Sequence, residues 1–261
     1  MLIAIIFIAY PLEKITEMYY NMFMNKIIIA IGGGEIREKA TAEIDEQIAA
    51  LAKKHAGDKR ANALFIGTAS HDSMPYYNSF HKTYTGLFGL KTDCVLTVYG
   101  EMNDEKIREK FEKADMIYVG GGDTIYMLEK WKECGVDKLI KEAYDRGVII
   151  CGLSAGAICW FEEMFTDSIG EEYEFEPALG YLKGGACPHY DDRKEDFFAK
   201  SQNAKIKDYV CIENLSAVLF VNGEMVSALK GEGNSYSVNI STEKAIFTAI
   251  PKKDLLNCDF H

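Results

Sequence analysis

Short apolar runs alternate with amphipathic helical stretches along most of this chain, and this alternation limits the possible folds more than any other feature. The runs are rich in Ile and Val, and we expect strands at 26–31, 62–68, 93–99, 116–119 and 148–151, with helices between them at 36–55, 76–87, 105–113, 125–134 and 136–146. Strands that are continuously apolar need cover on both faces. The sequence therefore predicts an α/β protein with three α/β/α layers and a mostly parallel central sheet.

The pattern changes after about Leu215, where two alternating runs in SAVLFVNGEMVSAL are joined by Asn222 and Gly223. An Asn-Gly pair between alternating runs is a strong signal for a two-residue hairpin. We therefore expect the sheet to end in antiparallel strands. No Pro-, Gly- or Ser-rich linker interrupts the chain, which predicts a single α/β domain over residues 24–261.

Residues 1–10 form a continuous apolar run, MLIAIIFIAY, at the start of the chain. The run is about half the ~20 residues that a transmembrane helix needs. It also lacks the preceding basic residues and the small-residue cleavage site of a signal peptide. Met24 begins MNKIIIAIGGG, which opens directly into a strand. We interpret residues 1–23 as an upstream extension that need not belong to the natural protein.

The charge balance argues against nucleic acid as a partner. The 261 residues carry 29 basic and 40 acidic side chains, a formal net charge of -11, and no Lys/Arg-rich run. The seven cysteines form no CxxC pair and are scattered through apolar runs, which is typical of reduced, buried thiols. We therefore expect a cytoplasmic protein that binds neither nucleic acid nor membrane.

The segment with the clearest chemical signal is Gly152-Leu153-Ser154-Ala155-Gly156, between an apolar strand and a helical pattern. A serine in such a G-x-S-x-G turn has a strained backbone and small neighbours, and its hydroxyl is presented at a helix N-terminus. Backbone N–H groups there can stabilise an oxyanion. Ser154 is therefore a candidate nucleophile, although a serine here could also simply cap the helix.

A serine nucleophile needs a general base, and the chain offers five histidines. His55 ends a charged helix and His261 is the last residue, so both are most simply solvated, while His71 and His81 flank a polar, aromatic loop. His189 follows a short apolar stretch and a proline, in GGACPHYD. Together with the serine turn, this position makes His189 the candidate base.

Two glycine clusters follow predicted strands, where α/β sheets commonly build their sites. The first, Gly120-Gly121-Gly122-Asp123, is expected to supply one oxyanion donor, with the Ala155 amide as the other. The second, at residues 32–34, fails as a dinucleotide fingerprint because Arg37 stands where the third glycine belongs. We expect it to form a tight turn that lines the same crevice.

The segments IGGGEI, VGGGDTIYML, GLSAGAICWFE and CPHYD, in this order and spacing, resemble the dipeptidase E and cyanophycinase family of serine peptidases. The resemblance extends from Met24 to about Val226. It implies a fold similar to that of class I glutamine amidotransferases, with serine in place of their nucleophilic cysteine. It also implies hydrolysis of short or unusual peptides, often at an aspartyl residue, without a metal or organic cofactor.

Carried over to this sequence, the resemblance implies Ser154 as nucleophile, His189 as base, and Gly122 and Ala155 as oxyanion donors. The acidic member of the triad matches Asp167 best. Four nearby glutamates could orient the imidazole instead or form a solvated acidic face, namely Glu171, Glu172, Glu174 and Glu176. The expected mechanism is acyl transfer to water through an acyl-enzyme.

Substrate contacts are expected from Gly121 and Asp123 in the glycine loop, although Asp123 stands where the family commonly has Asn. An acidic substrate would need a cation near the crevice, and Arg193 is the candidate, with Lys200 behind it. A cation at such a position is more often an ordinary helix-surface charge. We expect a compact cleft that binds a small peptide.

Three other functions compete with this prediction. An α/β-hydrolase acting on esters shares the serine turn but normally has more sheet between nucleophile and histidine. A cysteine-dependent amidotransferase conflicts with Ser154. A noncatalytic binding protein could keep the fold without the chemistry. The sequence leaves the number of subunits open, a homodimer included.

Overall fold

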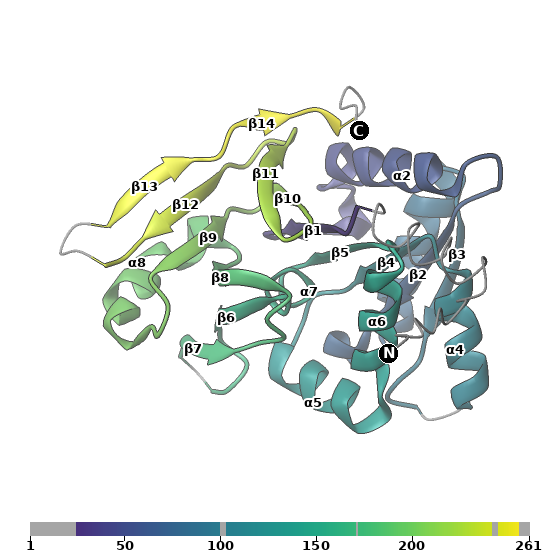
Figure 1. The fold of residues 1–261 in the computed structure, drawn as a ribbon, viewed down its shortest axis with the longest axis horizontal. Coiled ribbons are helices and arrows are strands. Elements are labelled where there is room, and N and C mark those ends of the chain that lie inside the picture. Colours follow the sequence, from purple (N-terminus) through teal and green to yellow (C-terminus); the bar gives the residue numbers. More distant parts are fainter. Residues whose placement is uncertain (1–24, 100–102, 171, 242–244, 256–261) are drawn as a thin grey trace, which may run out of the picture.

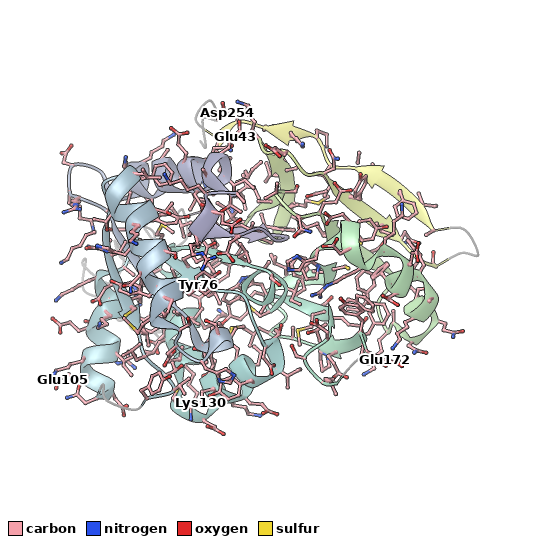
Figure 2. The ribbon with its side chains drawn as sticks, turned by 180° about the vertical axis from the view of Figure 1, so that it is seen from behind. Glu43, Tyr76, Glu105, Lys130, Glu172 and Asp254 are labelled. Atoms are coloured by element: carbon pink, nitrogen blue, oxygen red, sulfur yellow. The ribbon has the colours of Figure 1, made fainter. Side chains whose placement is uncertain are left out.

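The computed structural model describes residues 25–99, 103–170, 172–241 and 245–255, which form two β-sheets and the helices packed on them (Figure 1). The predicted extension at residues 1–23 lies outside the described residues. Charged side chains such as Glu105, Lys130 and Glu172 lie around the rim of the molecule (Figure 2). Within the described ranges, no helix combines the length and apolar character needed to cross a bilayer.

The larger sheet contains eight of the described strands, in the spatial order β14-β11-β10-β1-β5-β4-β2-β3. All five predicted strands are present, and they form its parallel part, β1-β5-β4-β2-β3. The strands of this sheet are β1 (Ile27–Ile31), β2 (Asn62–Ile66), β3 (Lys91–Val95), β4 (Met116–Val119), β5 (Ile149–Leu153), β10 (Ala217–Val221), β11 (Glu224–Leu229) and β14 (Lys252–Lys253).

Helices cover both faces of the larger sheet, so the prediction of three α/β/α layers is confirmed. Successive β1 residues point to opposite faces: Ile28 packs in one core cluster with Phe111 and Trp131, and Ile29 packs in another with Ile48. The longer helices of the first cluster are α4 (Asp104–Lys113), α5 (Thr124–Cys134) and α6 (Val136–Asp145). Those of the second are α2 (Ala42–Ala56), α3 (Met74–His81) and the π-helix η3 (Lys82–Leu87).

The predicted antiparallel hairpin is also confirmed. β10 and β11 pair antiparallel, and β10 pairs antiparallel with β1. Asn222 and Gly223 in the connecting turn have φ angles of 53° and 84°. Positive φ at both central residues is the geometry that an Asn-Gly turn favours.

The smaller sheet was not anticipated from the sequence, which predicted one sheet with antiparallel strands at its end. It contains six of the described strands, in the order β13-β12-β9-β8-β6-β7, and β6, β8 and β9 are parallel. These strands are β6 (Phe161–Thr166), β7 (Glu174–Pro177), β8 (Leu182–Cys187), β9 (Asp208–Ile212), β12 (Ser235–Asn239) and β13 (Ile246–Ala249). Helix α8 (Tyr190–Lys200) contributes Phe197 to an aromatic core with Phe165, Phe175 and Tyr209.

The first core cluster draws residues from both sheets, including Ile28 of β1 and Met164 of β6. That residues 24–261 form one domain stays a prediction. The remaining described helices are short: η1 (Ile36–Glu38), η2 (Thr68–Ser70), α7 (Ala155–Ile158) and η4 (Ser201–Asn203).

Two predicted boundaries shift for identifiable reasons. The predicted helix at 36–55 is interrupted because Lys39 adopts a left-handed conformation, with φ 60°, after η1. The third strand ends at Val95 instead of Tyr99. Beyond it the chain bonds to polar side chains: the Val98 N–H donates to Asp72 Oδ2 at 2.6 Å, and the Thr97 hydroxyl lies 2.8 Å from Thr68 Oγ1.

Candidate active site

Ser154 occupies the sharp turn between β5 and α7, with φ 54° and ψ −107°. Few non-glycine residues adopt such angles, which cost free energy and persist only where the surrounding structure imposes them. Both flanking glycines are needed for this close packing. A Cβ at Gly152 would lie 2.2 Å from the Gly156 carbonyl oxygen, and one at Gly156 would lie 2.2 Å from that of Val119. The G-x-S-x-G spacing thus reflects real contacts on both sides of the serine.

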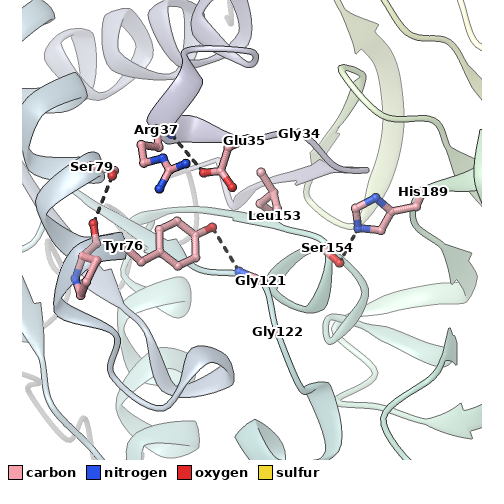
Figure 3. Close-up of a pocket in the computed structure, with 11 residues that line it drawn as sticks. Gly34, Glu35, Arg37, Tyr76, Ser79, Gly121, Gly122, Leu153, Ser154 and His189 are labelled. Atoms are coloured by element: carbon pink, nitrogen blue, oxygen red, sulfur yellow. Dashed lines mark hydrogen bonds between the residues drawn. The ribbon is translucent and has the colours of Figure 1, made fainter. Parts of the chain in front are cut away.

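His189 lies directly before α8 and faces Ser154 (Figure 3). Its Nε2 is 2.8 Å from Ser154 Oγ, which is hydrogen-bonding distance. The structure therefore brings together the two side chains that the sequence analysis paired. Gly33 makes room for the ring, since a Cβ there would lie 2.3 Å from His189 Nδ1. The second glycine cluster thus lines the same crevice, as expected.

Three consecutive carbonyl groups, at the end of β1 and directly after it, accept hydrogen bonds from the main chain of the site. Ser154 N–H donates to the Ile31 oxygen at 2.9 Å, and His189 N–H donates to the Gly32 oxygen at 3.0 Å. Leu215 N–H donates to the Gly33 oxygen, also at 3.0 Å. One short segment therefore sets the relative positions of three loops that are far apart in the sequence.

The second imidazole nitrogen of His189 faces Asn214. His189 Nδ1 lies 2.6 Å from Asn214 Oδ1. Two carboxylates orient the amide: Asn214 Nδ2 donates to Asp191 Oδ2 at 3.0 Å and to Asp192 Oδ2 at 2.7 Å. The Asn214 N–H also donates to Asp191 Oδ1 at 2.8 Å. Because the NH₂ group serves the carboxylates, the amide oxygen is left to accept the Nδ1 proton.

The expectation that Asp167 would contact His189 is therefore corrected. Asp167 follows β6 and forms an ion pair with Arg193, with Oδ1 and Nη2 3.5 Å apart. Two of the alternative acids, Glu172 and Glu174, bind Lys200 instead. Glu171 lies outside the described residues, and Glu176 has no hydrogen bond or ion pair to His189 in the part of the chain that the structure describes. The polar partner at His189 Nδ1 is the Asn214 amide and not a carboxylate.

The surroundings lower the pKa of His189 below its ordinary value. Burial is the largest cause, and the positive charge of Arg193 acts in the same direction. The hydrogen bond to Asn214 and the charges of Asp192 and Asp191 oppose the shift. The imidazole is therefore neutral at neutral pH, and a neutral imidazole can accept a proton from the serine.

The glycine loop after β4 lies against Ser154. A Cβ at Gly121 would lie 3.4 Å from the Ser154 Cβ, and Gly122 has φ +138° and lies against the Ala69 carbonyl oxygen. Ala155 is buried as the first residue of α7. Asp123, predicted to contact substrate, caps α5, where its Oδ1 accepts the Tyr126 N–H at 2.9 Å. One oxygen of its carboxylate thus caps the helix.

A cavity of about 440 Å³ opens beside Ser154 and His189. Gly121 and Gly122 line it on one side, and Glu35 and Arg37 on another (Figure 3). Sequence analysis gave neither charged residue a place in the crevice, although Glu35 directly follows the second glycine cluster and Arg37 comes two residues later. Within the described ranges, no group of three or more His, Cys, Asp or Glu side chains is arranged to hold a metal ion.

The predicted substrate cation, Arg193, does not line this cavity. It is 8% exposed, lies over the Tyr173 ring at 4.7 Å and pairs with Asp167. Lys200 is engaged by Glu172 and Glu174. Among the described residues that line the cavity, Arg37 carries the fixed positive charge.

The chain is similar to several known peptidases. Residues 28–228 match the model of Peptidase family S51. The chain is 32% identical over 234 residues to the uncharacterized peptidase YgaJ of Bacillus subtilis, covering 87% of this chain and 97% of that protein. It is 28% identical over 123 residues to Peptidase E of Streptomyces coelicolor, covering 46% of this chain and 50% of that protein.

Solved structures show the same fold. A peptidase from an acI-B1 Actinobacterium matches 88% of this chain and 100% of its own with a TM-score of 0.64, at 15% identity. A putative Peptidase E from Listeria monocytogenes matches 77% of this chain and 97% of its own with a TM-score of 0.57, at 20% identity. The family match spans more than half of the residues, so this chain belongs to Peptidase family S51 and is a peptidase.

Proposed function

We propose that this peptidase is a serine hydrolase that cleaves short peptides, in the manner of an aspartyl dipeptidase or a cyanophycinase. The 2.8 Å contact between Ser154 Oγ and His189 Nε2 is the observation that carries the proposal. A hydroxyl at this distance from a neutral imidazole can lose its proton as it attacks a carbonyl carbon. The strained serine turn next to a cavity supports the same conclusion.

The reaction proceeds in two halves. Ser154 Oγ attacks the scissile carbonyl while His189 Nε2 takes its proton, and the backbone N–H groups of Gly122 and Ala155 stabilise the resulting oxyanion. His189 then protonates the leaving amine, which leaves an acyl group on Ser154. In the second half, His189 activates a water molecule that attacks the acyl carbonyl, and the released serine regains its proton.

Asn214 keeps His189 in the productive tautomer. Its amide oxygen accepts the Nδ1 proton, so Nε2 is left free to act as the base. Asp191 and Asp192 hold the amide in this orientation and add negative charge one hydrogen bond further away. That charge stabilises the imidazolium that forms when the serine proton is taken.

The compact cavity supports small peptides as substrates. We also propose a cytoplasmic location. Cys187 and Cys211 are buried neighbours on β8 and β9, and a reducing compartment would keep such thiols reduced. A homodimer stays a prediction, which the mass of the native protein in solution tests.

The proposal is tested by labelling the protein with a serine-directed fluorophosphonate and by screening dipeptides, including α- and β-aspartyl ones. Wild-type protein is expected to be labelled and to hydrolyse at least one class. Ser154→Ala is expected to lose labelling and on the order of 10⁶-fold in turnover while remaining folded. A folded wild-type protein that neither reacts nor cleaves would favour a binding protein, and full activity in Ser154→Ala would reject the nucleophile.

A further inference from the structure

Tyr76 connects helix α3 to the glycine loop that follows β4, and the proposed mechanism gives it no role. Figure 3 shows its hydroxyl directed at Gly121. Tyr76 also lines the cavity that contains Ser154 and His189. A phenol thus lies beside the Gly120–Gly122 loop, which carries the proposed oxyanion donor Gly122.

The Tyr76 ring is fixed in place by its packing. It meets the buried Phe65 ring edge to face, with centroids 5.1 Å apart. On another side it lies against the backbone of Gly120, where an added Cβ would come within 2.9 Å of the Tyr76 Cε1. A glycine is therefore needed at position 120 for the ring and the loop to approach so closely.

The Tyr76 hydroxyl also holds the loop by a hydrogen bond. The Gly121 N–H donates to the Tyr76 oxygen at 3.2 Å. The other side of Gly121 faces the nucleophile turn, since a Cβ there would lie 3.3 Å from the Leu153 carbonyl oxygen. The peptide between residues 120 and 121 is thus held between the tyrosine and the serine turn, one residue before the proposed oxyanion donor Gly122.

The ionisation state suits this role. Burial raises the pKa of Tyr76 to about 12, with smaller contributions from the charges of Glu35 and Asp45, while the Gly121 hydrogen bond opposes the shift. The phenol therefore keeps its proton at neutral pH. A neutral hydroxyl can accept the Gly121 N–H without placing a negative charge beside the developing oxyanion.

We infer that Tyr76 is a positioning residue of the peptidase site: it holds the Gly120–Gly122 backbone so that the Gly122 N–H meets the oxyanion formed by attack of Ser154. This inference rests on the proposed function. An oxyanion donor is effective only when its position is fixed before the reaction, and a misplacement of about 1 Å can cost on the order of 10²-fold in rate. Tyr76 acts through the loop and does not need to touch the substrate.

The test compares Tyr76→Phe with Tyr77→Phe. Tyr77 is the adjacent residue on the same helix, and its ring also packs near Phe65, with centroids 6.0 Å apart, but its hydroxyl bonds Thr92 and not the loop. We expect Tyr76→Phe to lower kcat about tenfold or more with KM within about twofold of wild type. Tyr77→Phe is expected to keep wild-type kcat.

A second readout separates positioning from a general structural effect. A peptide aldehyde based on the best substrate adds to the serine and places an oxyanion in the loop, whereas the peptide product binds without one. Tyr76→Phe should weaken aldehyde inhibition by the same factor as kcat and leave product binding unchanged. If that variant does not fold, Gly120→Ala, which displaces the same ring from the loop side, should show the same selective loss.

The outcomes distinguish this inference from the function on which it rests. Wild-type protein without labelling or peptide hydrolysis would reject both. If the wild type is active but Tyr76→Phe and Tyr77→Phe have equal kcat values and equal aldehyde inhibition, the role of Tyr76 is overturned and the proposed function stands. Equal weakening of product and aldehyde binding in Tyr76→Phe would also overturn it, because a merely structural role predicts that result.

Discussion

The Nδ1 atom of His189 and the Oδ1 atom of Asn214 lie 2.6 Å apart, so the imidazole beside the candidate nucleophile is oriented by an amide and not by a carboxylate. The acidic charge comes one step later, from Asp191 and Asp192 on the Asn214 NH₂ group. Histidine oriented by asparagine also serves nucleophilic catalysis on unrelated protease folds. The arrangement makes Asn214 a direct target for mutation.

Replacement of Asn214 by alanine should impair catalysis more than stability. Without the amide oxygen, the imidazole loses the hydrogen bond that selects its tautomer, and we expect kcat to fall on the order of 10²- to 10⁴-fold. Asn239→Ala is a matched control, because Asn239 bonds Asp208 on the smaller sheet. Steady-state kinetics on the two purified variants measures the effect. Equal kcat values would show that Asn214 does not orient the base.

Gly33→Ala should displace the histidine without altering any polar group of the site. The new Cβ would lie 2.1 Å from Asn214 Oδ1 and 2.3 Å from His189 Nδ1, so both side chains must move. We expect a loss of about 10²-fold in kcat. Gly86→Ala is the control, since nothing lies within 4 Å of a Cβ there. Wild-type kinetics in Gly33→Ala would mean that the site absorbs the added methyl group.

Ser154→Gly should yield an inactive but more stable protein. The serine backbone has φ 54° and ψ −107°, a conformation that glycine adopts with little strain. Relief of that strain stabilises the folded state, while the greater conformational entropy of glycine in the unfolded chain offsets part of the gain. The net effect should raise the free energy of unfolding by about 1 kcal/mol. Ser154→Ala keeps the strain and serves as the comparison in urea denaturation. A glycine variant no more stable than the alanine variant would contradict this account.

Asp45 should make the protein less stable as pH rises through mildly acidic values. It is fully buried on α2, accepts hydrogen bonds from Thr41 and Tyr84, and has its pKa raised by burial to about 6. Because the unfolded pKa is about 3.9, the folded state binds more protons between pH 4 and 6, so the unfolding free energy falls across that window. The loss is on the order of 3 kcal/mol.

Asp45→Asn should remove most of this pH dependence, because the amide does not ionise. Chemical denaturation at pH 4, 5, 6 and 7 measures it, with the exposed Asp58→Asn as the control that keeps the wild-type slope. A wild-type slope in Asp45→Asn would assign the effect to other groups.

The parallel part of the fold could be predicted because four of its five strands, β1, β2, β4 and β5, are buried on both faces. A run such as IIIAI in β1 is apolar throughout, and that pattern has few alternatives. The smaller sheet carries a weaker signal. β8 reads LKGGAC, with two adjacent glycines, and β6 reads FEEMFT, in which Glu163 is nonetheless buried. Neither shows the alternation or the apolar run from which a strand is inferred.

The site could be predicted only where local spacing determines it. The turn around Ser154 is specified by its own glycines, and His189 was found because few histidines compete with it. Asn214 was missed because it follows an unpredicted strand and is not ionisable. Asp167 and Arg193 were assigned separate roles, whereas the structure pairs them with each other. The ion pair joins the residue after β6 to helix α8, a contact that sequence separation does not indicate.

The three successive carbonyl groups from Ile31 to Gly33 bind Ser154, His189 and Leu215 through main-chain atoms alone. A point substitution in this stretch keeps the three carbonyl oxygens. It therefore changes the space left for neighbouring side chains and not the main-chain hydrogen bonds. An insertion or deletion of a single residue would instead shift every attachment together and separate nucleophile, base and amide at once. The length of this segment is therefore constrained more tightly than its amino-acid composition.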